Sequence, residues 1–242
     1  MNRDIKEFDR MNSFLKCENV TKHYFLKKAL NGVSFEAERG IIIGLIGPNG
    51  AGKTTLLKTI FGLCRPTKGR VIFEGKYPDR STKARIAFLP EIDHLYDWMT
   101  VHQTINFISP FYPDWEKGRM AKLFDILNLD ERMEVGKLSK GQRARLKILL
   151  TLSRRSSLVL LDEPFSGIDP VSRGKILQAI NSEFRAEEQT IILSTHEVLE
   201  TESIFDRVII LEQGNIKLMG NIDDIRQKSG KSIRVLLEEV YG

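Results

Sequence analysis

The stretch that decides the fold reads Gly47-Pro48-Asn49-Gly50-Ala51-Gly52-Lys53-Thr54 and fits the pattern G-x-x-x-x-G-K-[S/T]. It follows the apolar run 41–46 and precedes the segment 54–63, in which apolar residues recur at helical spacing. Glycines here let the backbone wrap around a polyphosphate with its N–H groups pointing inward, and the following helix adds the positive end of its dipole. The stretch therefore predicts a phosphate-binding loop between a buried strand and a helix.

Segments on both sides of this loop extend the pattern into an α/β fold. The segments 14–24 and 29–40 alternate as half-buried antiparallel strands do, whereas 41–46 is apolar on both faces, as a central parallel strand is. Strands that alternate with helices predict a parallel, RecA-like P-loop core, here joined by an antiparallel β subdomain. The remaining predicted elements are strands at 71–75, 85–90, 158–161, 190–193 and 207–211, a hairpin at 215–219, and helices at 142–152 and 173–185.

Residues 92–137 differ in character from the rest of the chain. Their first half is rich in aromatic residues, and the later Met120, Leu123, Phe124 and Leu127 recur at helical spacing. We interpret this region as an inserted helical lobe. The predicted division is an N-terminal extension 1–12, a β subdomain with the first part of the P-loop core 13–91, the helical lobe 92–150, the second part of the core 151–220, and a C-terminal tail 221–242.

The composition limits the classes of protein that remain. The chain has 242 residues, with 37 Lys and Arg against 32 Asp and Glu, so its formal net charge is +5, which raises a nucleic-acid hypothesis. The two cysteines, Cys17 and Cys64, match no metal-ligand spacing and indicate a reduced cytosolic compartment. No apolar run reaches the ~18 residues that cross a bilayer, and the charged N-terminus lacks the apolar centre of a signal peptide.

Two carboxylates end the apolar strand at 158–161. In P-loop ATPases an aspartate at such a strand end holds Mg²⁺ with the loop threonine, so we expect Asp162 and Thr54 to hold the ion while Lys53 reaches the β- and γ-phosphates. Glu163 follows directly and can reach an attacking water, which makes it a candidate general base. Alone, the pair is more typical of solvated acids at a strand exit. Together with the phosphate loop it predicts nucleotide hydrolysis.

Three further motifs surround this strand. Leu138-Ser139-Lys140-Gly141-Gln142 opens a basic helix, Ser166-Gly167-Ile168-Asp169 follows the carboxylates, and Ser194-Thr195-His196 ends a strand. With the phosphate loop and in this order, they resemble the signature, D-loop and switch histidine of the ATP-binding subunits of ABC transporters. The resemblance covers nearly the whole chain, from about residue 14 to about residue 220. It implies an ATPase whose cofactors are ATP and Mg²⁺.

The resemblance also implies a head-to-tail dimer, either a homodimer or a heterodimer, with each ATP between the phosphate loop of one subunit and the signature of the other. In such a dimer His196 and the signature contact the γ-phosphate, Asp169 helps to join the two sites, and Tyr24 stacks on adenine. The alternative for Tyr24 is a strand aromatic packed on the core. The nucleotide-binding residues implied by the resemblance are Tyr24, Gly47, Pro48, Asn49, Gly50, Ala51, Gly52, Lys53, Thr54, Thr55, Ser139, Gly141, Gln142 and Asp169.

The chain departs from the family pattern at three positions. Lys140 stands where the signature usually has glycine, and it either adds charge near the phosphates or points to solvent. Glu91 stands at the Q-loop glutamine, where a carboxylate can ligand Mg²⁺ or position water, and Phe165 replaces a small residue. Glu91, Lys140 and the Phe-Tyr-Pro-Asp-Trp segment 111–115 together resemble one bacterial branch. Its ATPases serve ABC-2-type permeases, often exporters of drugs, peptides or envelope-related solutes.

The resemblance implies an integral-membrane permease as partner, and hence a cytoplasmic ATPase held peripherally on the inner face of the plasma membrane. We expect the permease to dock at the helical lobe and at the groove near Glu91. The aromatic residues of the lobe either form part of this docking surface or make up the lobe's own core. For each residue taken singly, the core is slightly favoured. They are Trp98, Phe107, Phe111, Tyr112 and Trp115.

Two other functions are open to a chain with these motifs. One is a non-transport ABC ATPase that acts on nucleic acid or ribosomes, but the chain has a single cassette and no sustained heptads, so we expect no nucleic-acid partner. The basic residues that crowd the signature helix suit a polyphosphate and an anionic membrane surface instead. The other is a module that senses ATP without hydrolysing it, and the presence of Glu163 and His196 argues against this hypothesis.

Overall fold

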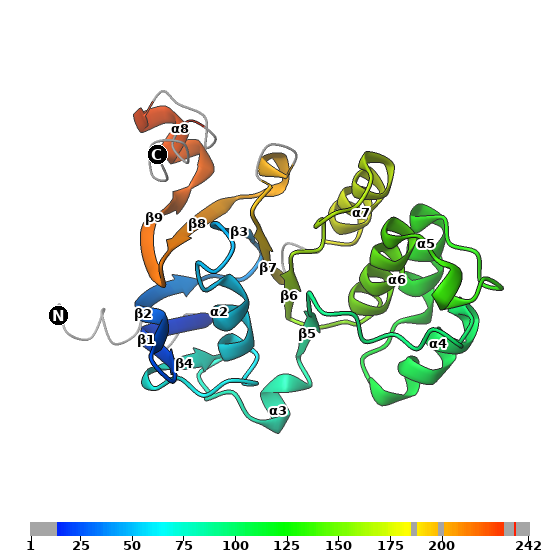
Figure 1. Cartoon of the computed structure of the whole chain (residues 1–242), viewed down its shortest axis with the longest axis horizontal. Helices are drawn as coiled ribbons and strands as arrows, with labels where there is room; N and C mark the ends of the chain where they lie inside the picture. Colours follow the sequence, from blue (N-terminus) through cyan, green and yellow to red (C-terminus); the bar gives the residue numbers. More distant parts are fainter. Residues whose placement is uncertain (1–13, 185–187, 198–200, 230–234, 236–242) are drawn as a thin grey trace.

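The computed structural model describes residues 14–184, 188–197, 201–229 and 235, and shows an α/β fold (Figure 1). The predicted N-terminal extension and the end of the predicted C-terminal tail lie outside these residues. Within the described part of the chain, the strands form one sheet of three strands and one of six. The predicted fold class, a mostly parallel core with an antiparallel β subdomain and a helical lobe, is confirmed.

The smaller sheet is antiparallel, has the order β2-β1-β4, and comprises β1 Leu15–Tyr24, β2 Lys27–Ala37 and β4 Lys68–Phe73. Its first strand alternates as predicted, because Leu15, Cys17 and Val20 are buried while the residues between them are more exposed. These buried side chains share an apolar core with the leucines of helix α2 (Lys53–Ile60). The smaller sheet and α2 thus cover the same face of the larger sheet.

The larger sheet has the order β5-β6-β7-β3-β8-β9. It comprises β3 Ile42–Ile46, β5 Ile86–Leu89, β6 Leu158–Asp162, β7 Thr190–Thr195, β8 Arg207–Glu212 and β9 Asn215–Asn221. Strand β3 lies between β7 and β8, parallel to both, and is buried throughout, as its apolar sequence predicted. Because β3, β6 and β7 are parallel, their carboxyl ends meet at one edge of the sheet.

Two apolar cores lie on opposite faces of the larger sheet. Along β3, Ile43 and Leu45 belong to the core that contains α2, whereas Ile42 and Ile46 belong to the other core. The second core contains the apolar side chains of α6 (Lys140–Leu152) and α7 (Pro170–Glu183). Since each residue along a strand points to the face opposite its neighbour, an apolar run without polar positions builds a sheet covered on both sides.

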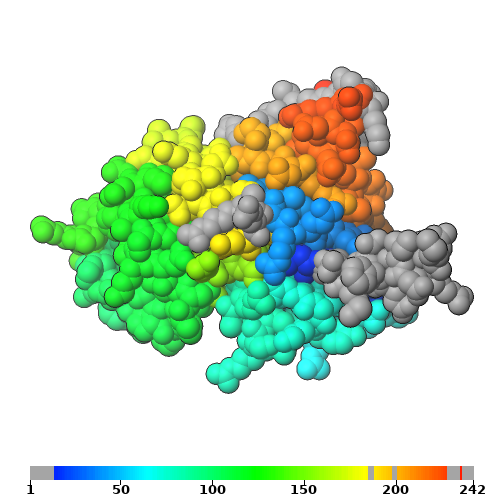
Figure 2. All heavy atoms as spheres, turned by 180° about the vertical axis from the view of Figure 1, so that it is seen from behind, coloured from blue at the N-terminus to red at the C-terminus, as the bar shows by residue number. Residues whose placement is uncertain are grey.

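The helical lobe lies at one side of the molecule, away from the smaller sheet (Figure 1), and forms the green region in the view from behind (Figure 2). Its elements are α4 Val101–Ile108, η1 Ser109–Phe111, α5 Lys117–Leu127, η2 Val135–Lys137 and α6. The other short helices are α3 Arg80–Lys83, η3 Glu202–Ile204 and α8 Ile222–Ser229. Across the described ranges, no helix has both the length and the apolar character that a membrane span requires.

Two helices begin earlier than the sequence predicted. Helix α6 begins at Lys140, because Ser139 and Gln142 form a capping box in which each side chain accepts the other's backbone N–H. Helix α7 begins at Pro170, because the Asp169 carboxylate accepts the backbone N–H of Ser172 at 2.8 Å and proline suits the first helical position. The predicted end of this helix at residue 185 lies outside the described residues.

The aromatic residues of the lobe are mostly on its surface. Trp98 is 70% exposed, Phe107 45%, Phe111 67% and Tyr112 36%, whereas Trp115 is partly buried against the core. The interpretation that each of them belongs to the lobe's own core is therefore wrong for four of the five residues. Aliphatic residues of α4, α5 and α6 already fill that core, so these rings remain outside it.

Candidate functional site

The phosphate loop connects the end of β3 to the start of α2, as its sequence predicted. Gly52 has φ of 109° and directly precedes the helix, in a backbone conformation that an L side chain rarely adopts. A Cβ at Gly52 would lie 2.5 Å from the carbonyl oxygen of Ala29, and one at Gly47 would lie 2.3 Å from that of Leu211. The loop is therefore packed so tightly against β2 and β8 that these two positions admit only glycine.

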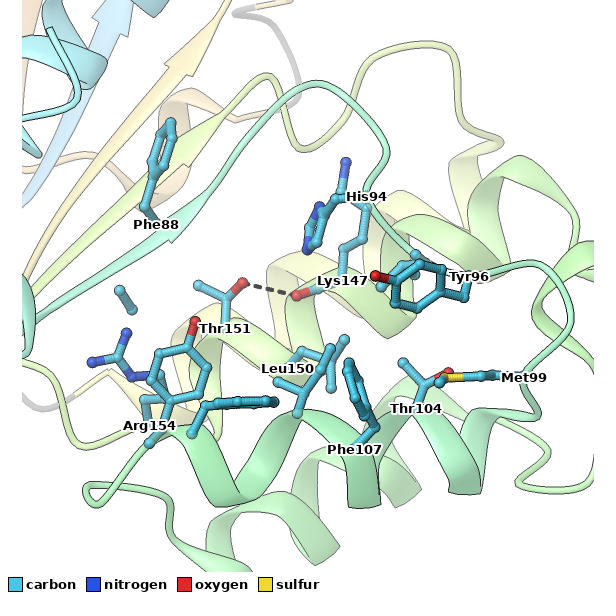
Figure 3. A pocket seen from close by; sticks show the side chains of 15 residues that line it. Phe88, His94, Tyr96, Met99, Thr104, Phe107, Lys147, Leu150, Thr151 and Arg154 are labelled. Atoms are coloured by element: carbon cyan, nitrogen blue, oxygen red, sulfur yellow. Dashed lines mark hydrogen bonds between the residues drawn. The ribbon is translucent and has the colours of Figure 1, made fainter.

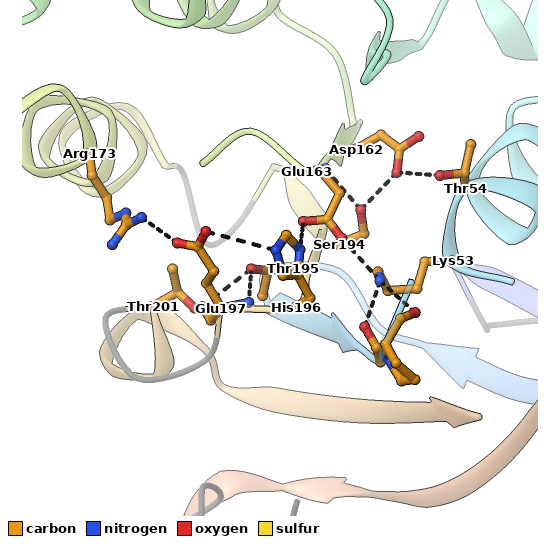
Figure 4. A network of polar contacts seen from close by, with 12 residues as sticks. Lys53, Thr54, Asp162, Glu163, Arg173, Ser194, Thr195, His196, Glu197 and Thr201 are labelled. Carbon is orange, nitrogen blue, oxygen red and sulfur yellow. Dashed lines mark hydrogen bonds and ion pairs between the residues drawn. The ribbon is translucent and has the colours of Figure 1, made fainter. Parts of the chain in front are cut away.

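The Lys53 side chain is folded back into the loop (Figure 4). It is only 5% exposed, and its Nζ donates to the carbonyl oxygens of Gly47 at 2.6 Å and Pro48 at 3.2 Å. The same Nζ lies 3.0 Å from Oε1 of Glu163, whose side chain is 7% exposed. The loop lysine and the candidate general base thus form a buried ion pair that joins α2 to the end of β6.

Asp162 accepts two hydrogen bonds on one of its carboxylate oxygens. The Thr54 hydroxyl donates to Oδ1 at 3.0 Å and the Ser194 hydroxyl donates to the same atom at 2.8 Å (Figure 4). The other oxygen, Oδ2, is buried and has no hydrogen-bond partner among the described residues. Burial raises the pKa of Asp162, the two hydroxyl donors oppose that shift, and the nearby negative charges of Glu91 and Glu163 add to it.

This arrangement fits a divalent cation. A buried carboxylate oxygen without a donor, beside a threonine hydroxyl, offers the hard oxygen ligands that Mg²⁺ prefers. Across the described residues, no group of three or more His, Cys, Asp and Glu side chains is placed to hold a metal ion. An ion at Asp162 therefore needs further oxygens from waters and from a bound phosphate, which is the usual situation of Mg²⁺ in nucleotide sites.

Glu163 does not continue the strand. Its φ of 49° lies in the left-handed region, where a non-glycine residue is uncommon, and its backbone N–H donates to the Ser194 hydroxyl at 3.0 Å. This turn brings the side chain into the site, where Oε2 lies 2.8 Å from Nδ1 of His196 at the end of β7. Lys53, Glu163 and His196 therefore form one continuous chain of contacts (Figure 4).

A cavity of about 340 Å³ opens beside this chain of contacts. Tyr24 lies at its edge and is 44% exposed, so the alternative that this ring packs on the core is wrong. Its hydroxyl lies 3.2 Å from Sγ of Cys64, a hydrogen bond that raises the pKa of Tyr24. The residues that line the cavity are Tyr24, Lys27, Ala29, Asn49, Gly50, Ala51, Gly52, Lys53, Thr54, Thr55, Glu91 and Glu163.

The signature residues are not among those that line this cavity, and they lie together with the D-loop instead. A Cβ at Gly141 would lie 2.2 Å from Oγ of Ser172 and 2.4 Å from Oδ2 of Asp169, so the first turns of α6 and α7 are in close contact. The backbone N–H of Ser172 lowers the pKa of Asp169. Ser139, Gly141, Gln142 and Asp169 thus form a second group, separate from the phosphate loop of the same chain.

Glu91 links the cavity to two neighbouring hollows. Its backbone carbonyl accepts from Nζ of Lys147 at 3.2 Å, and the residue also lines a groove of about 550 Å³ between the P-loop core and the helical lobe. A second hollow, of about 350 Å³, lies between Glu91, Glu163 and Lys140. The departures at positions 91 and 140 therefore lie near each other and near the candidate general base.

An aromatic pocket of about 260 Å³ adjoins the groove inside the lobe (Figure 3). Figure 3 shows His94 and Tyr96 on one side of this pocket and Phe107 on α4 on the other. Tyr96 and Phe107 pack edge to face, with ring centroids 6.0 Å apart, and Phe107 packs in the same way on Phe111. These exposed rings form a continuous apolar surface beside the groove.

Two residues of the site carried no predicted role. Ser194 begins the Ser194-Thr195-His196 motif, and its hydroxyl donates to Asp162 and accepts the backbone N–H of Glu163. The register that pairs Asp162 with Ser194 in neighbouring parallel strands is a property of the sheet that the linear sequence does not give. Lys27 lines the cavity because the antiparallel register of β1 and β2 pairs it with Tyr24, which lines the same cavity.

The chain matches a family profile described as ABC transporter over residues 30–166. It is 36% identical to an uncharacterized ABC transporter ATP-binding protein of Methanocaldococcus jannaschii, over 88% of this chain and 80% of that protein. It is 32% identical to the linearmycin resistance ATP-binding protein LnrL of Bacillus subtilis, over 89% and 72%. A solved ATP binding subunit of an ABC transporter superposes with a TM-score of 0.83 at 28% identity, over 95% and 100%. The chain belongs to the ABC transporter family, among its ATP-binding ATPases.

We expect Asp162→Asn to stabilise the nucleotide-free protein near neutral pH. Burial raises the folded-state pKa of Asp162 above its ordinary value of 3.8. The folded protein therefore loses stability as the pH rises from the ordinary pKa to the raised one, and the full cost is present above the raised pKa. Below the ordinary pKa the carboxyl is protonated in both states and there is no cost. The asparagine oxygen still accepts from Thr54 and Ser194 without the charge. Calorimetry should show a melting temperature higher by about 2–4 °C, which corresponds to a gain in the free energy of unfolding on the order of 1 kcal/mol. The gain should shrink as the pH falls toward the ordinary pKa.

Asp223→Asn is the matched control, because the Asp223 side chain is 98% exposed, and it should leave the melting temperature unchanged. A melting temperature of Asp162→Asn that equals or lies below the wild-type value at every pH would contradict the electrostatic argument.

Proposed function

We propose that this chain binds and hydrolyses MgATP in the cavity beside the phosphate loop and thereby powers a membrane transporter. The observation that carries the proposal is the chain of contacts that runs from the buried Lys53 and Glu163, which line that cavity, to the more exposed His196. A phosphate-binding lysine, a candidate general base and a histidine that orients this base are the side chains that hydrolysis of a phosphoanhydride requires.

The residues around the loop have two roles toward the nucleotide, since some neutralise its charge and others position its groups. The backbone N–H groups of 49–55 surround the phosphates, Lys53 neutralises the β- and γ-oxygens, and Tyr24 stacks on adenine. Glu163 accepts a proton from the attacking water as the water oxygen bonds to the γ-phosphorus, while the bond from that phosphorus to the bridging oxygen breaks and ADP leaves with this oxygen. His196 holds the Glu163 carboxylate in place and donates to the γ-phosphate. The support is geometric, since Tyr24, Lys53 and Glu163 line one cavity and His196 contacts Glu163.

Thr54, Asp162 and Glu91 are the residues that would hold Mg²⁺. The unpartnered, buried Oδ2 of Asp162 supports this role, as does the carboxylate of Glu91 in the lining of the cavity. The ion supplies positive charge to the phosphate oxygens when bound. The raised pKa of Asp162 also favours a cation, because a positive charge relieves the cost of burying the ionised carboxyl.

The second group of site residues acts on the ATP of a partner subunit. Ser139, Gly141 and Gln142 lie at the start of α6, next to Asp169, and outside the cavity of their own chain. A helix start is an anion site that a γ-phosphate fits, so a head-to-tail dimer would complete two ATP sites at once. The partner is a second copy of this chain or a related ATPase subunit. Loss of the γ-phosphate after hydrolysis would then loosen the interface.

The groove near Glu91 and the aromatic surface of the lobe would receive an integral-membrane permease, of the ABC-2 type. Exposed rings such as Trp98, Phe107 and Phe111 support this docking site, since large exposed apolar surfaces usually mark interfaces. A relative named Nod factor export ATP-binding protein I, 34% identical over 81% of this chain, supports export as the direction of transport. A chain bound to such a permease lies on the cytoplasmic face of the membrane.

We expect Lys53→Ala to abolish ATP hydrolysis, with a loss of about 100-fold or more in a phosphate-release assay, because the γ-phosphate loses its cation. Lys58→Ala is the matched control, since Lys58 lies on the same helix but does not line the cavity. The control should hydrolyse ATP at the wild-type rate. Turnover of the Lys53→Ala protein at the wild-type rate would overturn the assignment of the site.

We expect Glu163→Gln to accumulate as an ATP-bound dimer, because the amide leaves binding intact but cannot accept a proton from water. Size-exclusion chromatography with MgATP should show the dimer for this variant and mainly monomer for Glu134→Gln, a change at the exposed residue that precedes η2. If the Glu163→Gln protein runs as a monomer at saturating MgATP, the proposed dimer fails.

We expect the tagged protein, purified from gently solubilised membranes, to bring down a protein with several membrane spans. Phe107→Ser with Phe111→Ser should reduce that recovery at least tenfold by removing apolar contact area, whereas Tyr77→Ser, at a residue 61% exposed outside the lobe, should not. Consistent recovery of ribosomes or nucleic acid in place of a membrane protein would favour the non-transport function.

A further inference from the structure

The turn between β1 and β2 carries two fully exposed apolar side chains. Phe25 is 103% exposed and Leu26 is 104% exposed, so neither has any contact that shields it from water. Phe25 also has φ of 51°, a left-handed conformation that costs a bulky L residue about 1–2 kcal/mol and that glycine adopts freely. These two side chains add no packing within the fold, and glycine at Phe25 would avoid the backbone strain. Their presence points to a contact outside the chain.

The surface around this turn is strongly basic. The segments 19–35 and 39–73 contain no aspartate or glutamate at all. The hairpin is tied to the loop after α2, because Nζ of Lys22 donates to the carbonyl of Arg65 at 2.7 Å and the backbone of His23 donates to Thr67 Oγ1 at 3.1 Å. The cations near the turn are Lys27 and Lys28, which directly follow it, and Lys22, which precedes it and contacts Arg65, while Lys68 pairs with Thr21 on the neighbouring strand.

This basic, apolar surface continues into the groove between the core and the lobe. Leu63, which is 58% exposed, lines that groove with Lys58 and Lys83. Cys64, the residue after Leu63, contacts the Tyr24 hydroxyl. The groove is the proposed docking site of the permease, and the present inference rests on that proposal in one respect. A membrane protein docked in the groove would bring the adjoining surface close to the bilayer.

We propose that the hairpin tip, defined as Phe25 and Leu26 with the surrounding cations, binds an anionic lipid surface. The lysines lie against the headgroups, and the phenyl ring and the leucine side chain enter the boundary between headgroups and acyl chains. Apolar side chains set among lysines are typical of peripheral membrane contacts, and each lysine near an anionic surface adds to the attraction. The contact holds the hairpin, and with it Tyr24 at the cavity, next to the membrane.

The test is co-sedimentation of the purified full chain with large vesicles of phosphatidylglycerol and phosphatidylcholine in equal parts, compared with vesicles of phosphatidylcholine alone. We expect binding to the anionic vesicles only, and weaker binding as salt is added. Phe25→Gly with Leu26→Ser should bind at least tenfold more weakly, because the apolar insertion is lost. This variant should melt at or above the wild-type temperature, since glycine relieves the left-handed strain.

Tyr77→Ser, which removes an exposed ring from another surface, is the control and should bind as the wild type does. Equal binding to both kinds of vesicle, or unchanged binding of the Phe25→Gly, Leu26→Ser protein, would overturn the proposal. The proposal would also be overturned if the wild type formed a dimer on size exclusion and this double variant did not, because the tip would then contact a second copy of the chain.

ATP hydrolysis measured in the same preparation, without vesicles, separates this inference from the proposed function. Hydrolysis without vesicle binding overturns the lipid contact and leaves the ATPase site standing. Vesicle binding that depends on Phe25 and Leu26, without any hydrolysis, supports the lipid contact and overturns the proposed catalysis.

Discussion

The buried ion pair between Lys53 and Glu163 is the interaction on which the site depends. Both side chains are nearly excluded from water, and removing two charges from water is costly unless each is fully satisfied. The lysine meets this condition through the carbonyls of Gly47 and Pro48, and the glutamate through His196. In the proposed ATP site, a γ-phosphate would compete with Glu163 for the ammonium group of Lys53, so nucleotide binding would directly change the surroundings of the proposed general base.

This ion pair exists because three strand ends meet at one edge of the sheet. The register pairs Ile46 with Thr195 and Asp162 with Ser194, so the loop lysine, the two acids and the histidine lie within one side-chain length of each other. Apolar residues on both faces of β3, β6 and β7 fix that register, since a slip would expose buried isoleucine and leucine side chains. The chemistry of the edge is therefore set by the packing of the sheet below it.

The sequence predicted the parts of the fold that depend on local pattern. The loop glycines, the apolar run of β3 and the acidic end of β6 each carry a pattern that needs no long-range partner to be recognised. The left-handed turn at Glu163 and the bridging hydroxyl of Ser194 could not be predicted, because both depend on a neighbouring strand. The interpretation that the lobe's aromatic rings belong to its core was wrong for a related reason. Hydrophobic composition does not show which face of a helix packs against a partner.

The contact between Gly141 and Asp169 links the two groups of site residues in a way that neither motif shows alone. Because a Cβ at Gly141 would overlap Asp169, the starts of α6 and α7 cannot separate without losing tight packing, and they respond as one piece. Helix α7 begins seven residues after Glu163 (170 − 163), so a shift of its first turn also strains the turn that positions the general base. In the proposed dimer, a phosphate bound at the start of α6 would therefore act, through the start of α7, on the carboxylate of Glu163 in the same chain.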